Sequence, residues 1–167
     1  MRIHARRAAL AATAGLTAVL ALAAPASAVA NGDVVAEGHY RFAVKLTMTG
    51  IPTATGGKRN SGCSGALIAR RWIITAGHCF RDANGVRVER PVADLTTATL
   101  GRADLTTGAG IVRTVIAVRQ SPDRDIAVAE LDRPVPRAIR PLRLSRHAPA
   151  AGDVLRLTGW GEARQAA

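Results

Sequence analysis

The residue best suited to chemistry in this chain is His78, which follows a short run of β-branched and small residues and stands next to Cys79. A second cysteine, Cys63, precedes that run. We predict that residues 61–80 form two adjacent strands joined by a Cys63–Cys79 disulfide, with His78 just past the second strand. A histidine whose backbone is constrained at a strand end can act as a general base. Taken alone, a histidine in an apolar segment is more often a structural hydrogen-bond donor.

Short strand-like runs are the elements that would position His78. Two of them, residues 66–69 and 72–76, are separated by a basic turn at Arg70 and Arg71. The other runs are rich in β-branched residues or alternate apolar with polar ones: residues 41–48, 95–100, 111–118 and 125–131. Six such runs without helical periodicity predict an all-β barrel or sandwich. Residues 49–60, between two of these runs, are predicted to be a polar loop. After the sixth run we predict a proline-rich linker at residues 133–143 and a seventh strand at residues 152–160.

The amino-terminal residues 1–28 have the features of a cleaved secretory signal. Basic residues precede an apolar, alanine-rich run, and Ala26-Ser27-Ala28 provides a small-residue cleavage site. Cleavage there would leave a mature chain that begins at Val29 and is long enough for one domain. No later stretch is apolar enough to span a bilayer. We therefore expect a secreted protein that is not held in a membrane.

The cysteines favour a disulfide over a metal site. The chain has only two, and an oxidising compartment favours their pairing. Two cysteines and one nearby histidine also fall short of the four ligands of structural zinc. The acidic residues Asp82, Glu89 and Asp94 follow His78, but their spacing fits no calcium-ligand pattern, so a solvated loop is favoured. The sequence predicts neither a metal nor a cofactor.

The charge of the chain limits its partners. The formal net charge is +11, and the arginines are spread along the sequence. The few aromatic residues are isolated, which leaves no platform for stacking single-stranded bases. We therefore expect no nucleic-acid partner. Attraction to anionic polymers or acidic substrates is the more direct consequence of the charge.

Five motifs in order resemble those of the trypsin/chymotrypsin-like serine proteases. W-I-I-T-A-G-H-C at residues 72–79 resembles the histidine signature of that family, and C-S-G-A-L-I at 63–68 resembles the strand before it. D-I-A-V-A-E-L at 125–131 is similar to the aspartate motif. V-A-N-G at 29–32 resembles the mature amino terminus, and T-G-W-G at 158–161 resembles the start of the second barrel. The resemblance implies an all-β fold, an N-terminal six-stranded antiparallel barrel followed by the first strand of an incomplete second one.

The resemblance also implies roles for two residues. His78 would be the general base, and Asp125 would accept a hydrogen bond from the other ring nitrogen. Asp123 competes for the second role, but the apolar run begins at Asp125, which is therefore preferred. An aspartate at a strand start can equally be a cap or part of a solvated turn. Gly77 departs from the alanine that is common before the histidine.

The nucleophile of such a triad is not found in this sequence. The family's serine lies in a G-D-S-G-G loop of the second barrel, and no such loop occurs here. None of the serines present stands in a glycine-rich elbow: Ser27, Ser61, Ser64, Ser121 and Ser145. The oxyanion hole and substrate pocket would be missing as well. We therefore expect a truncated chain that is inactive alone.

These observations predict three segments of the chain, one favoured function and two alternatives. Residues 1–28 are predicted to be the signal, 29–144 the barrel and 145–167 the start of a truncated second barrel. The favoured function is a secreted serine endopeptidase that acts on a protein or peptide substrate once a second barrel is supplied. The alternatives are a non-catalytic secreted binding module and a half-enzyme that needs a partner. Association through the exposed barrel interface is also expected.

Overall fold

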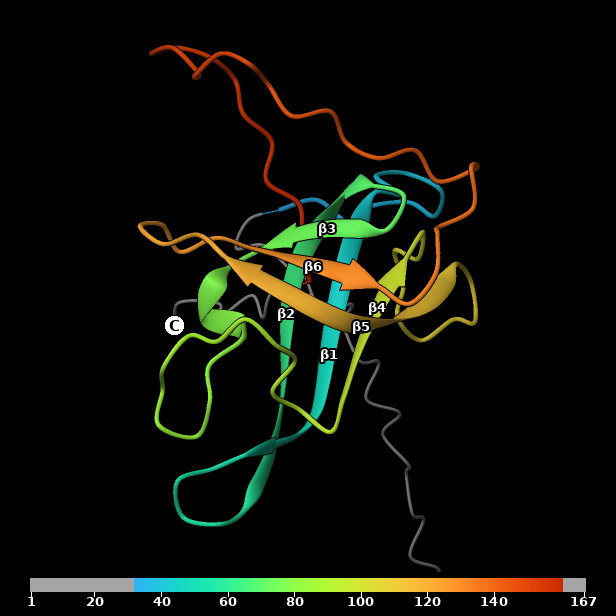
Figure 1. Cartoon of the computed structure of the whole chain (residues 1–167). Helices are drawn as coiled ribbons and strands as arrows, with labels where there is room; N and C mark the ends of the chain where they lie inside the picture. The colour runs from blue at the N-terminus through green and yellow to red at the C-terminus, as the bar shows by residue number, and fades with distance from the viewer. Residues whose placement is uncertain (1–31, 161–167) are drawn as a thin grey trace, which may run out of the picture.

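The structure, a computed structural model, describes residues 32–160 (Figure 1). The predicted signal at residues 1–28 and the predicted mature terminus Val29 lie outside the described residues. Six strands and one short 3-10 turn make up the regular structure of the described part. None of the helical segments described is long and apolar enough to cross a membrane.

The six strands close into one antiparallel barrel. Around the barrel the order is β1-β2-β3-β6-β5-β4, and β1 pairs with both β2 and β4, which closes the ring. The strand bounds are β1 Ala43–Pro52, β2 Lys58–Ala69, β3 Trp72–Thr75, β4 Leu95–Leu100, β5 Ile111–Gln120 and β6 Ala127–Leu131. The predicted all-β class and the predicted six-stranded barrel are therefore confirmed.

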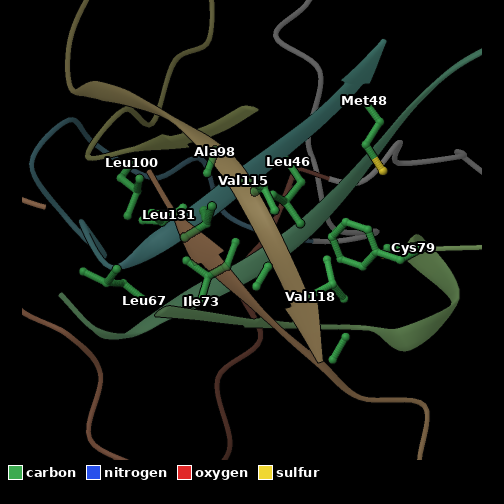
Figure 2. Packing of buried hydrophobic residues seen from close by; sticks show 14 of the residues in the cluster. Leu46, Met48, Leu67, Ile73, Cys79, Ala98, Leu100, Val115, Val118 and Leu131 are labelled. Carbon is green, nitrogen blue, oxygen red and sulfur yellow. The ribbon is translucent and has the colours of Figure 1, made fainter. Parts of the chain in front are cut away.

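Alternating apolar residues fill the interior of the barrel. In β1, Val44, Leu46 and Met48 are fully buried, while Thr47 on the opposite face is exposed. Because side chains alternate along a strand, this period-two pattern directs one face of β1 inward. Side chains from every strand meet in the same core, as Figure 2 shows for Leu67, Ile73, Ala98, Leu100, Val115, Val118 and Leu131.

Several predicted strand boundaries were wrong. The predicted polar loop at residues 49–60 is mostly strand, because β1 continues to Pro52 and β2 begins at Lys58. The register shifts between Met48 and Ile51, and Gly50 has a φ of 76° there, so a bulge allows the hairpin to continue past the glycine. The last strand, β6, begins at Ala127 rather than Asp125, whose side chain has another partner, described below.

The proline-rich segment after β6 forms no strand, as predicted for a linker, but it is packed against the barrel. Val135 and Ile139 are buried in the core. The Val135 amide donates to the Arg70 carbonyl, and the Leu142 amide donates to the Leu67 carbonyl. The segment then leaves the barrel and the chain returns toward it before residue 160 (Figure 1).

The predicted seventh strand at residues 152–160 is not formed in the described structure. This stretch is extended, but it pairs with none of the six strands. Val154, Leu155 and Leu157 are 97%, 74% and 81% exposed. A strand needs a hydrogen-bonded neighbour, and every strand of the closed barrel already has two. The chain is held instead at Trp160, whose backbone and indole N–H groups donate to Ser64 Oγ and to the Ala103 carbonyl.

Candidate active site

The backbone around His78 is fixed by a disulfide and a short helical turn. Cys63 of β2 is bonded to Cys79, which closes the 3-10 turn Gly77–Cys79 directly after β3. Cys79 is buried and lies at one end of the packed side chains in Figure 2. The Thr75 hydroxyl donates to the Ser64 carbonyl at 2.8 Å and ties the end of β3 to β2. The predicted disulfide is therefore confirmed, and it holds His78 at a strand end.

The structure brings Asp125 against His78 through two hydrogen bonds. One carboxylate oxygen, Oδ2, lies 2.7 Å from the ring Nδ1 of His78, and the other, Oδ1, accepts the His78 backbone N–H at 2.8 Å. With Nδ1 held by a carboxylate, the imidazole is fixed in orientation and tautomer, and Nε2 is left for proton transfer. The competing residue, Asp123, accepts from the Ser121 hydroxyl and lies beside Arg124 instead.

Hydrogen bonding controls the charge of this carboxylate. The side-chain and backbone hydrogen bonds from His78 lower the pKa of Asp125 from its ordinary value of 3.8, with smaller contributions from the charges of His78 and Arg87. The Arg87 guanidinium lies 4.0 Å from Asp125 Oδ1. Both partners remain open to solvent, since the side chains of His78 and Asp125 are 56% and 57% exposed. Asp125 is therefore ionised at neutral pH and poised to stabilise a charged imidazole ring.

Two side chains behind the turn support it, and the sequence provided no signal for either. The Gln120 side-chain amide at the end of β5 donates to the Gly77 carbonyl at 3.1 Å and to the Val88 carbonyl at 3.2 Å. A Cβ at Gly77 would lie 2.6 Å from Gln120 Oε1 and 3.0 Å from Arg87 Nη1. The ends of these two side chains would therefore have to shift to admit an alanine methyl at Gly77.

A cavity of about 270 Å³ lies beside His78. Its other lining residues include Lys45, Ser64 and Trp160, together with both disulfide cysteines. The Ser64 hydroxyl accepts the Trp160 backbone N–H at 3.2 Å. Within residues 32–160, no serine hydroxyl forms a hydrogen bond with His78. The described part of the chain thus provides an imidazole with a carboxylate on its Nδ1, beside an open space through which a reacting group could approach.

The residues that could have bound a metal have other partners. Cys63, His78 and Cys79 bring their ligand atoms within 4.8 Å of one another, but the two sulfurs form the disulfide and offer no thiolate. The acidic residues of the following loop are dispersed. Asp82 accepts two backbone N–H groups of its own turn, Glu89 accepts the Gln120 backbone N–H, and Asp94 pairs with Lys58 at 2.6 Å.

Comparison with known proteins gives a consistent result. The family profile described as Trypsin matches residues 29–167. The chain is 35% identical over 102 residues to a beta-fibrinogenase-like protein of Daboia siamensis, a match that covers 60% of this chain. It is 31% identical over 108 residues to human Trypsin-3, covering 61% of this chain. The solved structure "Structure of GrC" has the same fold over 72% of this chain and 52% of its own, with a TM-score of 0.55 and 21% identity.

These matches extend over only part of each relative. The chain aligns with 39% of the beta-fibrinogenase-like protein and with 34% of Trypsin-3. Human Kallikrein-14, which is 28% identical over 117 residues, is also covered to 39%.

Proposed function

The chain belongs to the trypsin family, and from this premise we propose that its barrel carries the base and the orienting carboxylate of a Ser-His-Asp peptide hydrolase. The observation that supports this best is the double hydrogen bond between Asp125 and His78. An aspartate that merely capped a turn would accept backbone N–H groups, whereas Asp125 also accepts from the ring at 2.7 Å. This is the arrangement that positions a histidine for proton transfer.

In this proposal His78 transfers a proton twice. Its Nε2 takes the proton of a serine hydroxyl as that oxygen attacks the scissile carbonyl, and it then returns the proton to the departing amine. Asp125 remains ionised throughout and stabilises the imidazolium that forms between the two transfers. The Cys63–Cys79 disulfide and the Gln120 hydrogen bonds keep the ring in place, so little reorganisation is needed at each step.

The nucleophile, the oxyanion hole and the substrate pocket would come from polypeptide outside this sequence. The chain corresponds to about two fifths of the relatives it matches, 39% in two of the three compared. The cavity beside His78 and the exposed apolar residues Val154, Leu155 and Leu157 lie where further structure could pack. We propose that this structure is a second barrel, on the same polypeptide or on a partner chain.

We also propose that the protein is secreted. The amino-terminal residues have the pattern of a cleaved signal, and the disulfide requires an oxidising compartment to form. Among its relatives are snake venom serine proteases. The strong positive charge would favour acidic substrates by electrostatic attraction.

The proposed function can be tested on the product that the source organism secretes. Its intact mass would show whether polypeptide beyond residue 167 is present, and a fluorophosphonate probe would report an activated serine. We expect labelling, and we expect Asp125→Asn to lower the rate of peptide hydrolysis on the order of 10⁴-fold because the ring loses its orientation and its counter-charge. Asp123→Asn is the matched control and should leave the rate unchanged.

Two outcomes would contradict the proposal. If the product is labelled but Asp125→Asn and His78→Ala retain full activity, the active site lies elsewhere. If neither the product alone nor the product with its co-purifying partners is labelled, the barrel is a non-catalytic binding module. A Ser64→Ala variant completes the set, since loss of labelling there would place the nucleophile on β2.

A further inference from the structure

The segment that follows β6 concentrates positive charge to a degree seen nowhere else in the chain. Residues 133–147, here termed the arginine segment, contain five arginines and no acidic residue, and the next carboxylate is Asp153. The arginines recur at nearly every third position: Arg133, Arg137, Arg140, Arg143 and Arg146. All five are exposed.

The backbone of this segment is held against the barrel over its first half. Val135 and Ile139 are buried between the exposed arginines, and two backbone N–H groups of the segment donate to carbonyls of the β2–β3 hairpin. Arg70 Nε donates to the Val135 carbonyl at 3.1 Å. Because these contacts already fix the backbone, a ligand that binds here does not have to order it, and less entropy is lost on binding.

Most of these charges have no counter-ion within the described structure. Arg133 lies 3.7 Å from Asp132, but within residues 32–160 no carboxylate pairs with the other four arginines. The backbone positions of arginines three residues apart can be separated by at most about 10 Å, close to the Debye length at physiological salt, and the turn closed by the Ile139 N–H and the Pro136 carbonyl shortens the path further. Their potentials therefore overlap, and the segment forms a continuous positive strip.

A second cavity extends this strip. It has a volume of about 270 Å³ and is bordered by Arg41 and Arg140, with Tyr40 and Phe42 as its aromatic walls. The Arg156 guanidinium lies 5.9 Å from the centre of the Tyr40 ring and donates to the Tyr40 hydroxyl. Arg156 thus contacts Tyr40 directly, and Arg41 and Arg140 line the same cavity from two other parts of the chain.

We propose that the arginine segment and the cavity between Arg41 and Arg140 bind a linear polyanion whose sulfate or phosphodiester groups are carried on a sugar or polyol chain. Guanidinium groups bind such tetrahedral oxyanions through paired N–H donors, and a row of them matches a polymer better than a single small anion. The aromatic residues of this surface, Tyr40 and Phe42, lie together in the cavity and none lies along the arginine segment, so successive bases would find no row of rings on which to stack. This argues against single-stranded nucleic acid. The cavity between Arg41 and Arg140 shares no lining residue with the cavity beside His78, so the proposal does not depend on peptidase activity.

The test compares two variants with equal net charge. The segment variant replaces Arg137, Arg140 and Arg143 by glutamine. The control variant replaces Arg59, Arg90 and Arg119, which are also exposed and have no carboxylate partner in the described structure. Binding of the intact secreted protein is measured by calorimetry at several salt concentrations. Heparin represents the sulfated class, poly(glycerol phosphate) the phosphodiester class, and oligothymidylate of similar charge represents nucleic acid. Thermal unfolding checks that all variants remain folded.

We expect the segment variant to lose at least tenfold in affinity for heparin, poly(glycerol phosphate) or both, and the control to lose less than threefold. The slope of log affinity against log salt should fall by about one for each arginine that contacts an anion. If heparin binds more tightly, the ligand is a sulfated polymer; if poly(glycerol phosphate) binds more tightly, the ligand is a phosphodiester polymer. Equal losses in the two variants would overturn the proposal, because they would show attraction to net charge alone. Equally tight binding of oligothymidylate to the wild type would also overturn it, in favour of a nucleic-acid ligand.

Discussion

At the scale of single residues, Asp125 has two tasks. One of its oxygens holds the ring of His78 and the other holds the His78 backbone, so a single carboxylate fixes both the position and the orientation of the imidazole. The same two bonds lower the pKa of Asp125. Geometry and charge are therefore coupled at this residue.

This coupling predicts how the site responds to acid. A carboxylate with a depressed pKa in the folded state stabilises that state above its unfolded pKa, and the stabilisation is lost as pH falls through the lower folded value. We expect the amide proton of His78, which donates to Asp125 Oδ1, to shift with a midpoint below the ordinary value of 3.8. Proton–nitrogen correlation spectra between about pH 6 and about pH 2 would measure this midpoint. The shift should disappear in Asp125→Asn, and a midpoint at or above the ordinary value would contradict the depressed pKa.

Gly77 is the second residue whose replacement is informative. An alanine methyl there would meet the ends of the Gln120 and Arg87 side chains, and Gln120 is held by two hydrogen bonds. Because these are ends of flexible side chains that can shift, we expect Gly77→Ala to lower the free energy of unfolding by about 1 kcal/mol, the low end of the usual cost of overpacking. Urea denaturation would measure the loss. A double-mutant cycle with Gln120→Ala should show a coupling of about 1 kcal/mol, and additive effects would mean that the two residues do not interact.

The residues of the site differed in how far the sequence could predict them. His78, Asp125 and the cysteines lie in short local motifs, which the sequence displays directly. Arg87 and Gln120 do not. They reach the turn at Gly77 only because the loop after Phe80 and the end of β5 fold back onto it, and these are contacts between residues far apart in the chain.

At the scale of elements, alternation located the strands because each strand has one face in the barrel. Prediction from alternation failed where strand pairing or a side-chain hydrogen bond determined the local structure. Gly50 reads as a turn residue, yet β1 continues through it as a bulge because β2 supplies a partner on the far side. Asp125 reads as the start of β6, yet it stands outside the strand because its side chain and its position serve His78.

The disulfide is the covalent link between two of these elements, and its removal should weaken the barrel. Cys63 and Cys79 are separated by 16 positions, and closing a loop of this size contributes roughly 3 kcal/mol in the chain-entropy description. We expect the double variant Cys63→Ala and Cys79→Ala to lose about that free energy of unfolding, measured by guanidinium denaturation. Reduction of the wild type without substitution should give a similar loss. A loss below about 1 kcal/mol would mean that strand pairing alone holds the turn.

At the scale of the whole molecule, the closed barrel explains why residues 152–160 form no strand. Prediction from the sequence recognised their apolar, extended character but could not know that all six strands already have two neighbours. Whether a strand pairs depends on free edges, which are a property of the assembled barrel. The consequence is a length of exposed apolar chain, with Val154, Leu155 and Leu157 facing solvent.

Exposed apolar chain of this kind predicts association. Burying it would remove apolar area from water, worth about 25 cal/mol per Å², and could give the extended backbone a strand partner. We expect the isolated chain to self-associate, and we expect Val154→Thr, Leu155→Gln and Leu157→Gln together to make it monomeric, as measured by sedimentation equilibrium. The matched control replaces three exposed apolar residues elsewhere: Val34→Thr, Val86→Thr and Leu105→Gln. If the control variant lowers association equally, nonspecific hydrophobic association rather than contact through this segment is responsible. If neither variant has any effect, another face of the barrel forms the contact.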